Sequence, residues 1–212
     1  CIRDSPSIGT VSTGSSTGWS TSSSVTLTGL VNSVDDGLGS GLAFTEISLD
    51  NTAWTQTGGD SYSLTLNDGI HTISLRATDN VGNIGPTSQI TIQVDTEAPI
   101  EGQWNVDELT TALIGAANVE FIATDFTSGV DASSSFIEYG FDSNGFGQTP
   151  DISGTWQPSM GTGLDSTVAQ SSWATKSRQY LMLRATVMDV AGNTIVTNPV
   201  SYTHLTLPTI RE

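Results

Sequence analysis

The chain carries at residues 71–83 the stretch His71-Thr-Ile-Ser-Leu-Arg-Ala-Thr-Asp-Asn-Val-Gly-Asn83. Its first part alternates Ile and Leu with Thr, Ser and Arg, and this period of two residues is typical of a half-buried β-strand. Its last part, Asp79-Asn-Val-Gly-Asn83, has residue types that favour a tight turn with left-handed backbone. The same strand and turn return at Gln179-Tyr-Leu-Met-Leu-Arg-Ala-Thr-Val-Met-Asp-Val-Ala-Gly-Asn193. The chain therefore contains two copies of one β-structured unit.

Landmarks upstream of the two stretches repeat in the same order. Each copy has a Ser-Gly pair, a strand that ends in Asp, and a Trp. These are Ser40-Gly41, Thr45-Glu-Ile-Ser-Leu-Asp50 and Trp54 in the first copy, and Ser128-Gly129, Phe136-Ile-Glu-Tyr-Gly-Phe-Asp142 and Trp156 in the second. A shared order is far more specific than any one of these short strings.

With these landmarks the chain resembles the bacterial immunoglobulin-like repeats of surface and secreted proteins. The first copy carries two more parts of that pattern, Asp68-Gly-Ile-His-Thr72 and Val94-Asp-Thr-Glu-Ala-Pro99. The second copy lacks the Asp-Gly-x-His-Thr part and has a long insertion between Phe141 and Arg178. The resemblance implies a β-sandwich module that serves as a stalk or accessory domain and has no activity of its own.

We expect an all-β chain of two tandem immunoglobulin-like β-sandwich domains. The first would span residues 6–97, and the second residues 98–199 with an insertion at residues 142–177. Pro99 disfavours helical backbone at Ala98, so the joint between the domains should be extended. The expected strands are residues 8–11, 25–30, 44–49, 62–66, 70–77 and 89–94 in the first domain, and 100–104, 119–123, 136–141, 180–187 and a segment from 195 in the second. Residues 107–116 are a candidate for one helical turn.

Both ends of the chain match sequences used in DNA library preparation. Residues 1–5, Cys1-Ile-Arg-Asp-Ser5, are what the transposase end sequence encodes in one reading frame. Residues 200–212 begin with Val200-Ser-Tyr-Thr-His-Leu-Thr-Leu-Pro-Thr209, the translated reverse complement of that end and its adapter. We expect both segments to be adapter-derived and exclude them from reasoning on fold and function. Cys1 then says nothing about the redox compartment.

The composition fits an acidic, secreted β-protein and excludes several classes of function. The 212 residues include 22 Gly and only six Lys and Arg, and the net charge is −16. The two basic and two acidic residues at the excluded ends cancel, so the acidity belongs to the rest of the chain. Nucleic-acid binding is excluded because it requires basic side chains that neutralise phosphates. The charge also disfavours anionic membrane surfaces, no membrane insertion is expected, and divalent cations are favoured as partners.

Asp and Asn side chains cluster in the expected loops. They are Asp79, Asn83 and Asp95 in the first copy, and Asp125, Asp131, Asp189 and Asn193 in the second. The B–C and F–G loops of an immunoglobulin-like sandwich share one end, so the four residues of the second copy should lie near one another. Such oxygen donors can hold Ca²⁺, which takes about six to eight oxygen ligands. The alternative is that these residues cap turns, a role for which Asp and Asn are suited.

Tryptophan residues are the second kind of candidate. Trp54 and Trp156 stand at equivalent positions after the strand that ends in Asp. An exposed Trp can stack on a sugar ring. A residue that recurs at the same place in each module is more simply part of the core or of a sheet edge. Trp173, in the insertion, is the better candidate for a ligand contact.

The sequence gives little support for catalysis. A nucleophile triad needs His, and His71 lies in a strand among Ile and Thr, where we expect a half-exposed residue with no catalytic partner. A glycosidase needs two carboxylates that face one cleft, whereas each Asp here is explained by a turn. A zinc site needs Cys or several His. We therefore expect no enzyme.

These inferences favour a non-catalytic spacer in a larger extracellular or cell-surface prokaryotic protein, with neighbouring repeats of the same chain as its partners. The alternative is a ligand-binding accessory module of a secreted hydrolase or adhesin, with a carbohydrate or a surface protein as its ligand. An exposed aromatic face on one sheet would favour the alternative.

Overall fold

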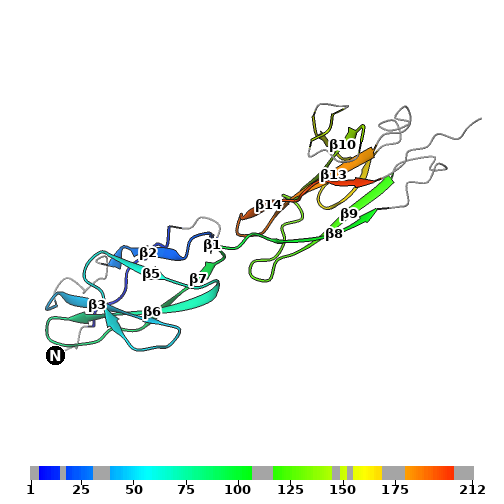
Figure 1. Cartoon of the computed structure of the whole chain (residues 1–212). Coiled ribbons are helices and arrows are strands. Elements are labelled where there is room, and N and C mark those ends of the chain that lie inside the picture. The colour runs from blue at the N-terminus through cyan, green and yellow to red at the C-terminus, as the bar shows by residue number, and fades with distance from the viewer. Residues whose placement is uncertain are drawn as a thin grey trace, which may run out of the picture. The chain divides into compact units, whose positions relative to one another are not determined.

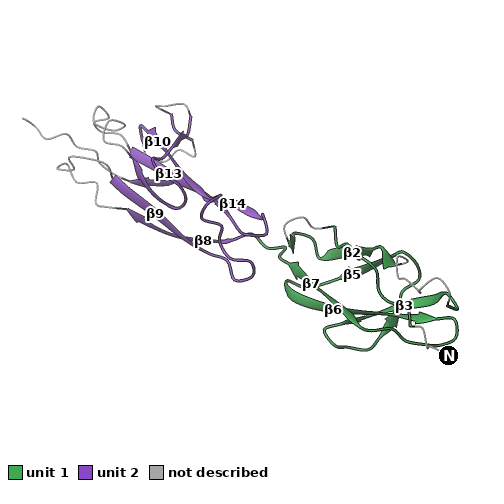
Figure 2. Ribbon diagram, turned by 180° about the vertical axis from the view of Figure 1, so that it is seen from behind, with its two compact units in different colours: residues 1–97 green, residues 98–212 purple. Residues whose placement is uncertain are grey.

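The computed structural model describes residues 5–14, 18–30, 39–106, 117–144, 149–151, 155–168 and 180–202. Their regular elements are the β-strands β1 to β15, which confirms the prediction of an all-β chain (Figure 1). The chain divides into two compact units, residues 1–97 and residues 98–212 (Figure 2). Among the described residues, no helix has the length and apolar character that a membrane crossing needs.

Unit 1 consists of two β-sheets. The larger sheet contains, in spatial order, β1 (Trp19–Ser20), β7 (Ser88–Val94), β6 (Gly69–Asp79), β3 (Leu42–Leu49) and β4 (Thr55–Gln56). The smaller sheet contains β2 (Ser24–Thr28) and β5 (Ser61–Thr65). Neighbouring strands are antiparallel, except that β1 runs parallel to β7. This division of strands between two sheets is that of an immunoglobulin-like sandwich.

The alternation in the sequence explains why the two sheets of unit 1 face each other. β2 buries Val25 and Leu27 and exposes the Ser and Thr residues between them. The other sheet contributes Ile73 and Leu75 of β6, both fully buried, to the same core. Because alternate side chains point to opposite faces of a strand, the polar residues face solvent and the apolar ones fill the space between the sheets.

Unit 2 also consists of two β-sheets, of which the smaller has three strands. Its larger sheet contains β11 (Gln157–Pro158), β10 (Phe136–Asp142), β13 (Tyr180–Met188), β14 (Thr194–Val196) and β15 (Val200–Tyr202), the last two both paired with β13. Its smaller sheet contains β12 (Asp165–Val168), β9 (Ala117–Thr124) and β8 (Ile100–Val106). Val119 and Phe121 from the smaller sheet meet Leu181 and Leu183 from the larger one in a single buried core.

β8 is an edge strand with an irregular backbone. Its register against β9 shifts between Ile100 and Gln103. A Cβ atom on Gly102, within this shift, would lie 1.5 Å from the carbonyl oxygen of Ile122. The bulge therefore requires glycine at this position because the two backbones approach too closely for any side chain.

The structure differs from the expected strands in several places. β4 was not expected, and β15 lies within the segment expected to be adapter-derived, yet it pairs with β13. No strand covers residues 8–11; Ile8 and Val11 pack against the core, an isolated bridge joins Ser12 to Thr28, and the strand that follows is β1. Residues 142–177, expected as an insertion, contribute β11 and β12, and β12 completes the smaller sheet of unit 2. The candidate helical turn at residues 107–116, and also Trp173, lie outside the described residues.

Candidate functional site

The strands β6 and β13 each end in the turn that the sequence repeats. In unit 1, Oδ1 of Asp79 accepts hydrogen bonds from the backbone N–H groups of Val81 at 3.0 Å and Asn83 at 2.7 Å, and Oδ2 accepts from Nδ2 of Asn83 at 2.7 Å. Gly82 has a φ of 88°, the left-handed conformation that glycine adopts freely. Burial raises the pKa of the Asp79 carboxyl, but these hydrogen bonds outweigh it and hold the pKa below its ordinary value of 3.8.

The turn in unit 2 has the same construction. Oδ1 of Asp189 accepts from the backbone N–H groups of Gly192 at 2.6 Å and Asn193 at 2.8 Å, and Oδ2 accepts from Nδ2 of Asn193 at 2.9 Å. Gly192 has a φ of 105°. The predicted turn with left-handed glycine is therefore present in both copies, and its Asp and Asn cap each other within one turn.

Two further carboxylates of unit 2 cap the loop between β9 and β10. Oδ1 of Asp125 accepts from the three consecutive backbone N–H groups of residues 127–129, at distances between 2.7 and 3.1 Å. Oδ1 of Asp131 accepts from the Ser133 hydroxyl at 2.6 Å and from the backbone N–H groups of residues 133 and 134. The hydrogen bonds from Ser133 and its neighbour lower the pKa of Asp131 below its ordinary value.

The structure brings together only part of the candidate calcium set. Carboxylate oxygens of Asp125 and Asp189 lie within 4.8 Å of each other in unit 2, as expected. The Asp131 carboxylate is directed to its own turn, although its backbone N–H donates to the carbonyl of Met188 at 2.8 Å. These contacts account for the carboxylates as turn caps, and calcium binding stays a prediction.

In unit 1 the candidate residues lie at opposite ends of one strand. Asp95 follows Val94, which pairs with Gly69 at the start of β6, whereas Asp79 is the last residue of β6. Asp95 is fully buried, and its Oδ1 accepts from the backbone N–H of Glu97 at 3.2 Å. Eleven residues of extended β6 span roughly 35 Å, so Asp79 and Asp95 cannot share one ion.

A Trp–Arg–Glu ladder lies on the outer face of the larger sheet in unit 1. Nε of Arg76 is 2.7 Å from a carboxylate oxygen of Glu46 on the neighbouring strand, and the guanidinium carbon is 4.1 Å from the ring centroid of Trp54. The ring is partly buried. Stacking of a guanidinium on an indole is a favourable cation–π contact, so this Trp is explained by packing on the sheet.

Unit 2 has the same ladder at the equivalent positions. Nε of Arg184 is 2.7 Å from a carboxylate oxygen of Glu138, and its guanidinium carbon is 4.5 Å from the ring centroid of Trp156. Repetition of the two Trp residues indicated a common packing role, and the ladder supplies its physical basis. The Glu and Arg partners were missed because an ion pair across two strands leaves no spacing signal in a sequence.

The only histidine among the described residues has a carboxylate partner, which we did not expect. Nδ1 of His71 lies 2.9 Å from Oδ2 of Asp50, and Nε2 lies 2.9 Å from the carbonyl oxygen of Asn67. The residue is half-buried, as expected of a strand residue. Both ring nitrogens thus contact a carboxylate or a carbonyl, and neither contacts a hydroxyl, so this pair lacks the nucleophile of a catalytic triad.

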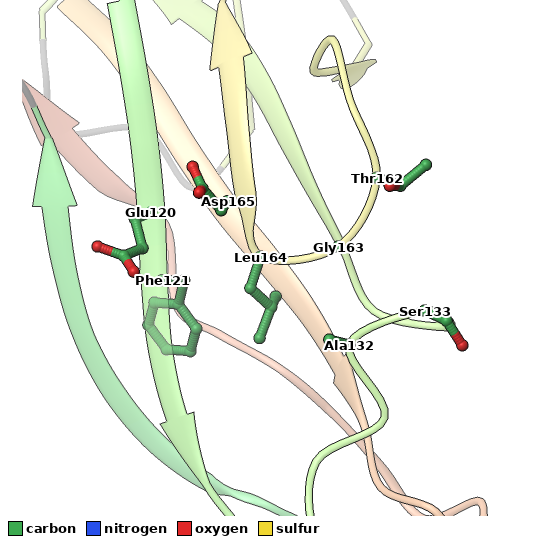
Figure 3. Close-up of a pocket in the computed structure, with 8 residues that line it drawn as sticks. All are labelled: Glu120, Phe121, Ala132, Ser133, Thr162, Gly163, Leu164 and Asp165. Atoms are coloured by element: carbon green, nitrogen blue, oxygen red, sulfur yellow. The ribbon is translucent and has the colours of Figure 1, made fainter.

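A cavity of about 370 Å³ opens in unit 2. Its lining consists of Glu120, Phe121, Ala132, Ser133, Thr162, Gly163, Leu164 and Asp165 (Figure 3). Figure 3 shows the side chain of Leu164 between Phe121 and Ala132, with the Glu120 carboxylate directed to the opposite side from Ser133. A ligand pocket brings a few polar groups to one point. The acidic side chains of this cavity, Glu120 and Asp165, are paired residues of β9 and β12, and Ser133 and Thr162 belong to loops beside that smaller sheet.

No protein-family model matches the chain, and no curated protein matches it in sequence. Among solved structures, the chain is similar to carbohydrate-binding modules of the β-sandwich superfamily, with 15% identity, a TM-score of 0.41, and coverage of 95% of this chain and 100% of that one. It is also similar to a 1.5-MDa bacterial ice-binding adhesin, with 22% identity, a TM-score of 0.42, and coverage of 95% of this chain and 64% of that one.

A third similar structure is the chitinase ChiA74 from Bacillus thuringiensis, with 16% identity and a TM-score of 0.36 over 95% of this chain. The chain spans 29% of that chitinase and 64% of the adhesin chain. At these TM-scores the likenesses carry no argument on function. The assignment of an all-β chain of immunoglobulin-like β-sandwich units rests on the strand order and cores of the two units.

Proposed function

We propose that this chain is a non-catalytic spacer in a larger extracellular or cell-surface protein, with neighbouring repeats as its partners. The observation that carries the proposal is that the same internal contacts recur in both units. Each unit has an Asp-capped turn and a Trp–Arg–Glu ladder, and in both cases the polar groups serve the unit itself. Repetition of contacts that hold a module together supports a role in which the folded module itself serves to fill length along a larger chain.

Charge and composition support the same proposal. A net charge of −16 in a chain with six basic residues favours solubility and repulsion between adjacent copies. The single Cys lies in the N-terminal segment that we expect to be adapter-derived, so the proposed function involves no thiol chemistry. Extracellular location follows from the resemblance to bacterial surface repeats and belongs to the proposal.

The test is mechanical unfolding of single molecules that contain this chain between two marker domains of known unfolding length. A spacer should show two separate unfolding events per chain, one for each compact unit, because each has its own core. Unfolding of both units in one step, or extension without measurable resistance, would refute the proposal. Sequence variants of the outer sheet face should leave the number of events unchanged.

A second candidate function, ligand binding by an accessory module, is favoured by a row of side chains beside the ladder of unit 2. In unit 2, Phe136 pairs with Thr186, which pairs with Val196 on the next strand. Paired residues share one face of a sheet, and Phe136 and Val196 are 45% and 54% exposed. An exposed aromatic and aliphatic row is the kind of surface on which a sugar ring packs.

Affinity electrophoresis in gels that contain soluble polysaccharides tests this second function. Retardation of the native chain, lost in Phe136→Ser and kept in Ile122→Ser, would support it. Ile122 is the matched control because it is 52% exposed on the other sheet. Equal mobility of all three proteins in every gel would rule out binding of those polysaccharides by this face.

A further inference from the structure

His71 joins two turns at one end of unit 1. The residue lies near the start of β6, and its Nδ1 is 2.9 Å from Oδ2 of Asp50 in the turn after β3. Its Nε2 is 2.9 Å from the carbonyl oxygen of Asn67, in the turn between β5 and β6. A carboxylate and a carbonyl can only accept hydrogen bonds. Both ring nitrogens therefore face acceptors.

This arrangement selects one protonation state of the ring. A neutral imidazole carries one N–H group, so one of its two contacts would place a nitrogen lone pair against an oxygen lone pair. The imidazolium ion carries two N–H groups and donates to both acceptors. We infer that His71 is a pH-dependent brace, which ties the Asp50 turn and the Asn67 turn together when protonated and releases one of them when neutral.

Backbone conformation and hydrogen bonds hold the Asp50 carboxylate, the acceptor of the Nδ1 contact, in place. Asp50 and Asn51 have φ angles of 48° and 61°, in the left-handed region. Oδ1 of Asp50 accepts from the backbone N–H of Thr72 at 2.8 Å, and the backbone N–H of Asp50 donates to the Thr72 carbonyl at 2.8 Å. The turn stays attached to β6 by these bonds after His71 loses its proton. The brace therefore changes local stability and does not unfold the unit.

Other groups near His71 could also affect its titration only through charge or direct contact. Asp68 is the nearest acidic residue on the β5–β6 turn, and its carboxylate accepts from the backbone N–H and hydroxyl of Thr96. On β7 the residue paired with His71 is Ile92, which has no charge. Among the described residues, Asp50 is thus the carboxylate that contacts the ring.

The direction of the pH effect follows from the two partners. The hydrogen bonds to Asp50 and to the Asn67 carbonyl raise the pKa of His71 above its ordinary value of 6.5, against the opposing effect of partial burial. The hydrogen bond from His71 lowers the pKa of Asp50 below 3.8. Stability from His71 is fully present below the unfolded pKa and is lost as the pH rises through the folded pKa. Stability from Asp50 is fully present above its unfolded pKa and is lost as the pH falls through the lowered folded pKa.

The described residues of unit 2 include no histidine. Alignment of the repeated strands places Gln179 opposite His71, and Gln does not titrate. The two units of one molecule therefore give an internal comparison for any effect of pH. Unit 1 should respond near neutral pH through His71, and the equivalent strand of unit 2 should not.

The experiment is an NMR titration of the imidazole signals in the full chain. The chain has two histidines, and His71→Gln removes one set of signals and so identifies the other as His204. We expect His71 to titrate above 6.5, the ordinary value, in the native chain. A titration at or below that value would overturn the inference.

Asp50→Asn provides the decisive variant. Asn tolerates left-handed backbone, so the turn can be kept. Its Oδ1 can accept from Thr72, and its Nδ2 can donate to Nδ1 of a neutral His71, which then donates through Nε2 to Asn67. The pKa of His71 should fall relative to the native chain. An unchanged pKa would show that Asp50 does not hold the proton and would overturn the brace.

Hydrogen exchange gives a readout that does not depend on Asp50→Asn folding. Protection of the backbone amides at residues 50 and 72, corrected for the intrinsic effect of pH, should decrease from about pH 6 to about pH 8 in the native chain. The same amides in His71→Gln should show no such decrease. Equal pH dependence in both proteins would refute the role of His71.

Discussion

Units 1 and 2 share the order of the strands at the centre of the larger sheet, the Asp-capped turn and the Trp–Arg–Glu ladder, but they differ in the contacts that their other turns make. Unit 1 ties two turns together through His71 and Asp50, whereas unit 2 brings the carboxylates of Asp125 and Asp189 within 4.8 Å of each other. The shared features are contacts along and across the strands of the sheets. The differing features lie in turns, where a change costs no core packing. The comparison teaches that the β-sandwich is the constant part of the module. The turn contacts differ from one copy to the other.

The largest expected effect is on the two cores. Leu75 of β6 and Leu183 of β13 occupy equivalent positions and are both fully buried. We expect Leu75→Ala and Leu183→Ala each to lower the free energy of unfolding of its own unit by about 2–5 kcal/mol, because each leaves a cavity in a separate core. Hydrogen exchange measured by mass spectrometry in increasing urea reports on the two units separately. Loss of protection in unit 2 after Leu75→Ala would show that the units are coupled.

The second largest expected effect is that of Ca²⁺, which should raise the stability of unit 2 but not that of unit 1. Two carboxylates close together repel each other, and Ca²⁺ bound between Asp125 and Asp189 would stabilise unit 2 by about 2.7 kcal/mol at a concentration a hundredfold above Kd. Melting curves with millimolar Ca²⁺ and then with chelator measure this. Asp189→Asn should lower the baseline stability and remove the response, and Asp79→Asn should lower only the baseline. Asp95→Asn tests whether Asp95 contributes a ligand. Identical curves in both conditions for the native chain would leave turn capping as the whole role.

Substitutions in the Trp–Arg–Glu ladders should change the stability of the two units by similar amounts. Trp54→Ala and Trp156→Ala each remove an indole from beneath a guanidinium, and we expect a loss of about 1 kcal/mol in the unit concerned. The paired variants Glu46→Gln and Glu138→Gln should cost less, since the ion pairs are partly exposed to solvent. Urea denaturation of each variant supplies the values. A cost in one unit and none in the other would show that the repeated geometry is not a repeated source of stability.

The smallest effect concerns the C-terminal segment, in which β15 pairs with β13 at the positions where β7 pairs with β6 in unit 1. Removal of residues 203–212 should leave the melting temperature of unit 2 nearly unchanged if this segment is adapter-derived. Removal of residues 200–212 should cost more, because Val200 and Tyr202 in β15 pair with β13 and pack against the core. Burial there raises the pKa of Tyr202. A large fall in melting temperature after the shorter deletion would show that the segment is native sequence.

The strands were predictable where one face of the sheet is buried. Alternation over residues 70–77 and 180–187 identified β6 and β13 because a buried face imposes a period of two on the residue types. β1 was missed because two residues in parallel pairing give no period. β12 was missed because its four residues, Asp165–Val168, alternate too briefly and follow a segment with no repeat in the first copy.

The candidate site was predictable only in part. The Asp and Asn residues in a turn pattern predicted the capped turns, since the groups that hydrogen-bond to each Asp lie within four residues of it along the chain. The contact between His71 and Asp50 joins residues that are 21 positions apart, and it depends on two successive residues with left-handed backbone. Sequence patterns report local partners well, but they do not report which two turns a sheet places side by side.

The bulge at Gly102 bears on how copies of this module behave when crowded. An edge strand offers a row of unpaired backbone groups on which another chain can add a strand, the first step of aggregation. β8 is such an edge, and its register breaks between Ile100 and Gln103. A straight incoming strand cannot match both sides of that break. No other residue can replace Gly102 without moving the Ile122 carbonyl. The bulge at Gly102 therefore disfavours edge-to-edge strand pairing between neighbouring molecules.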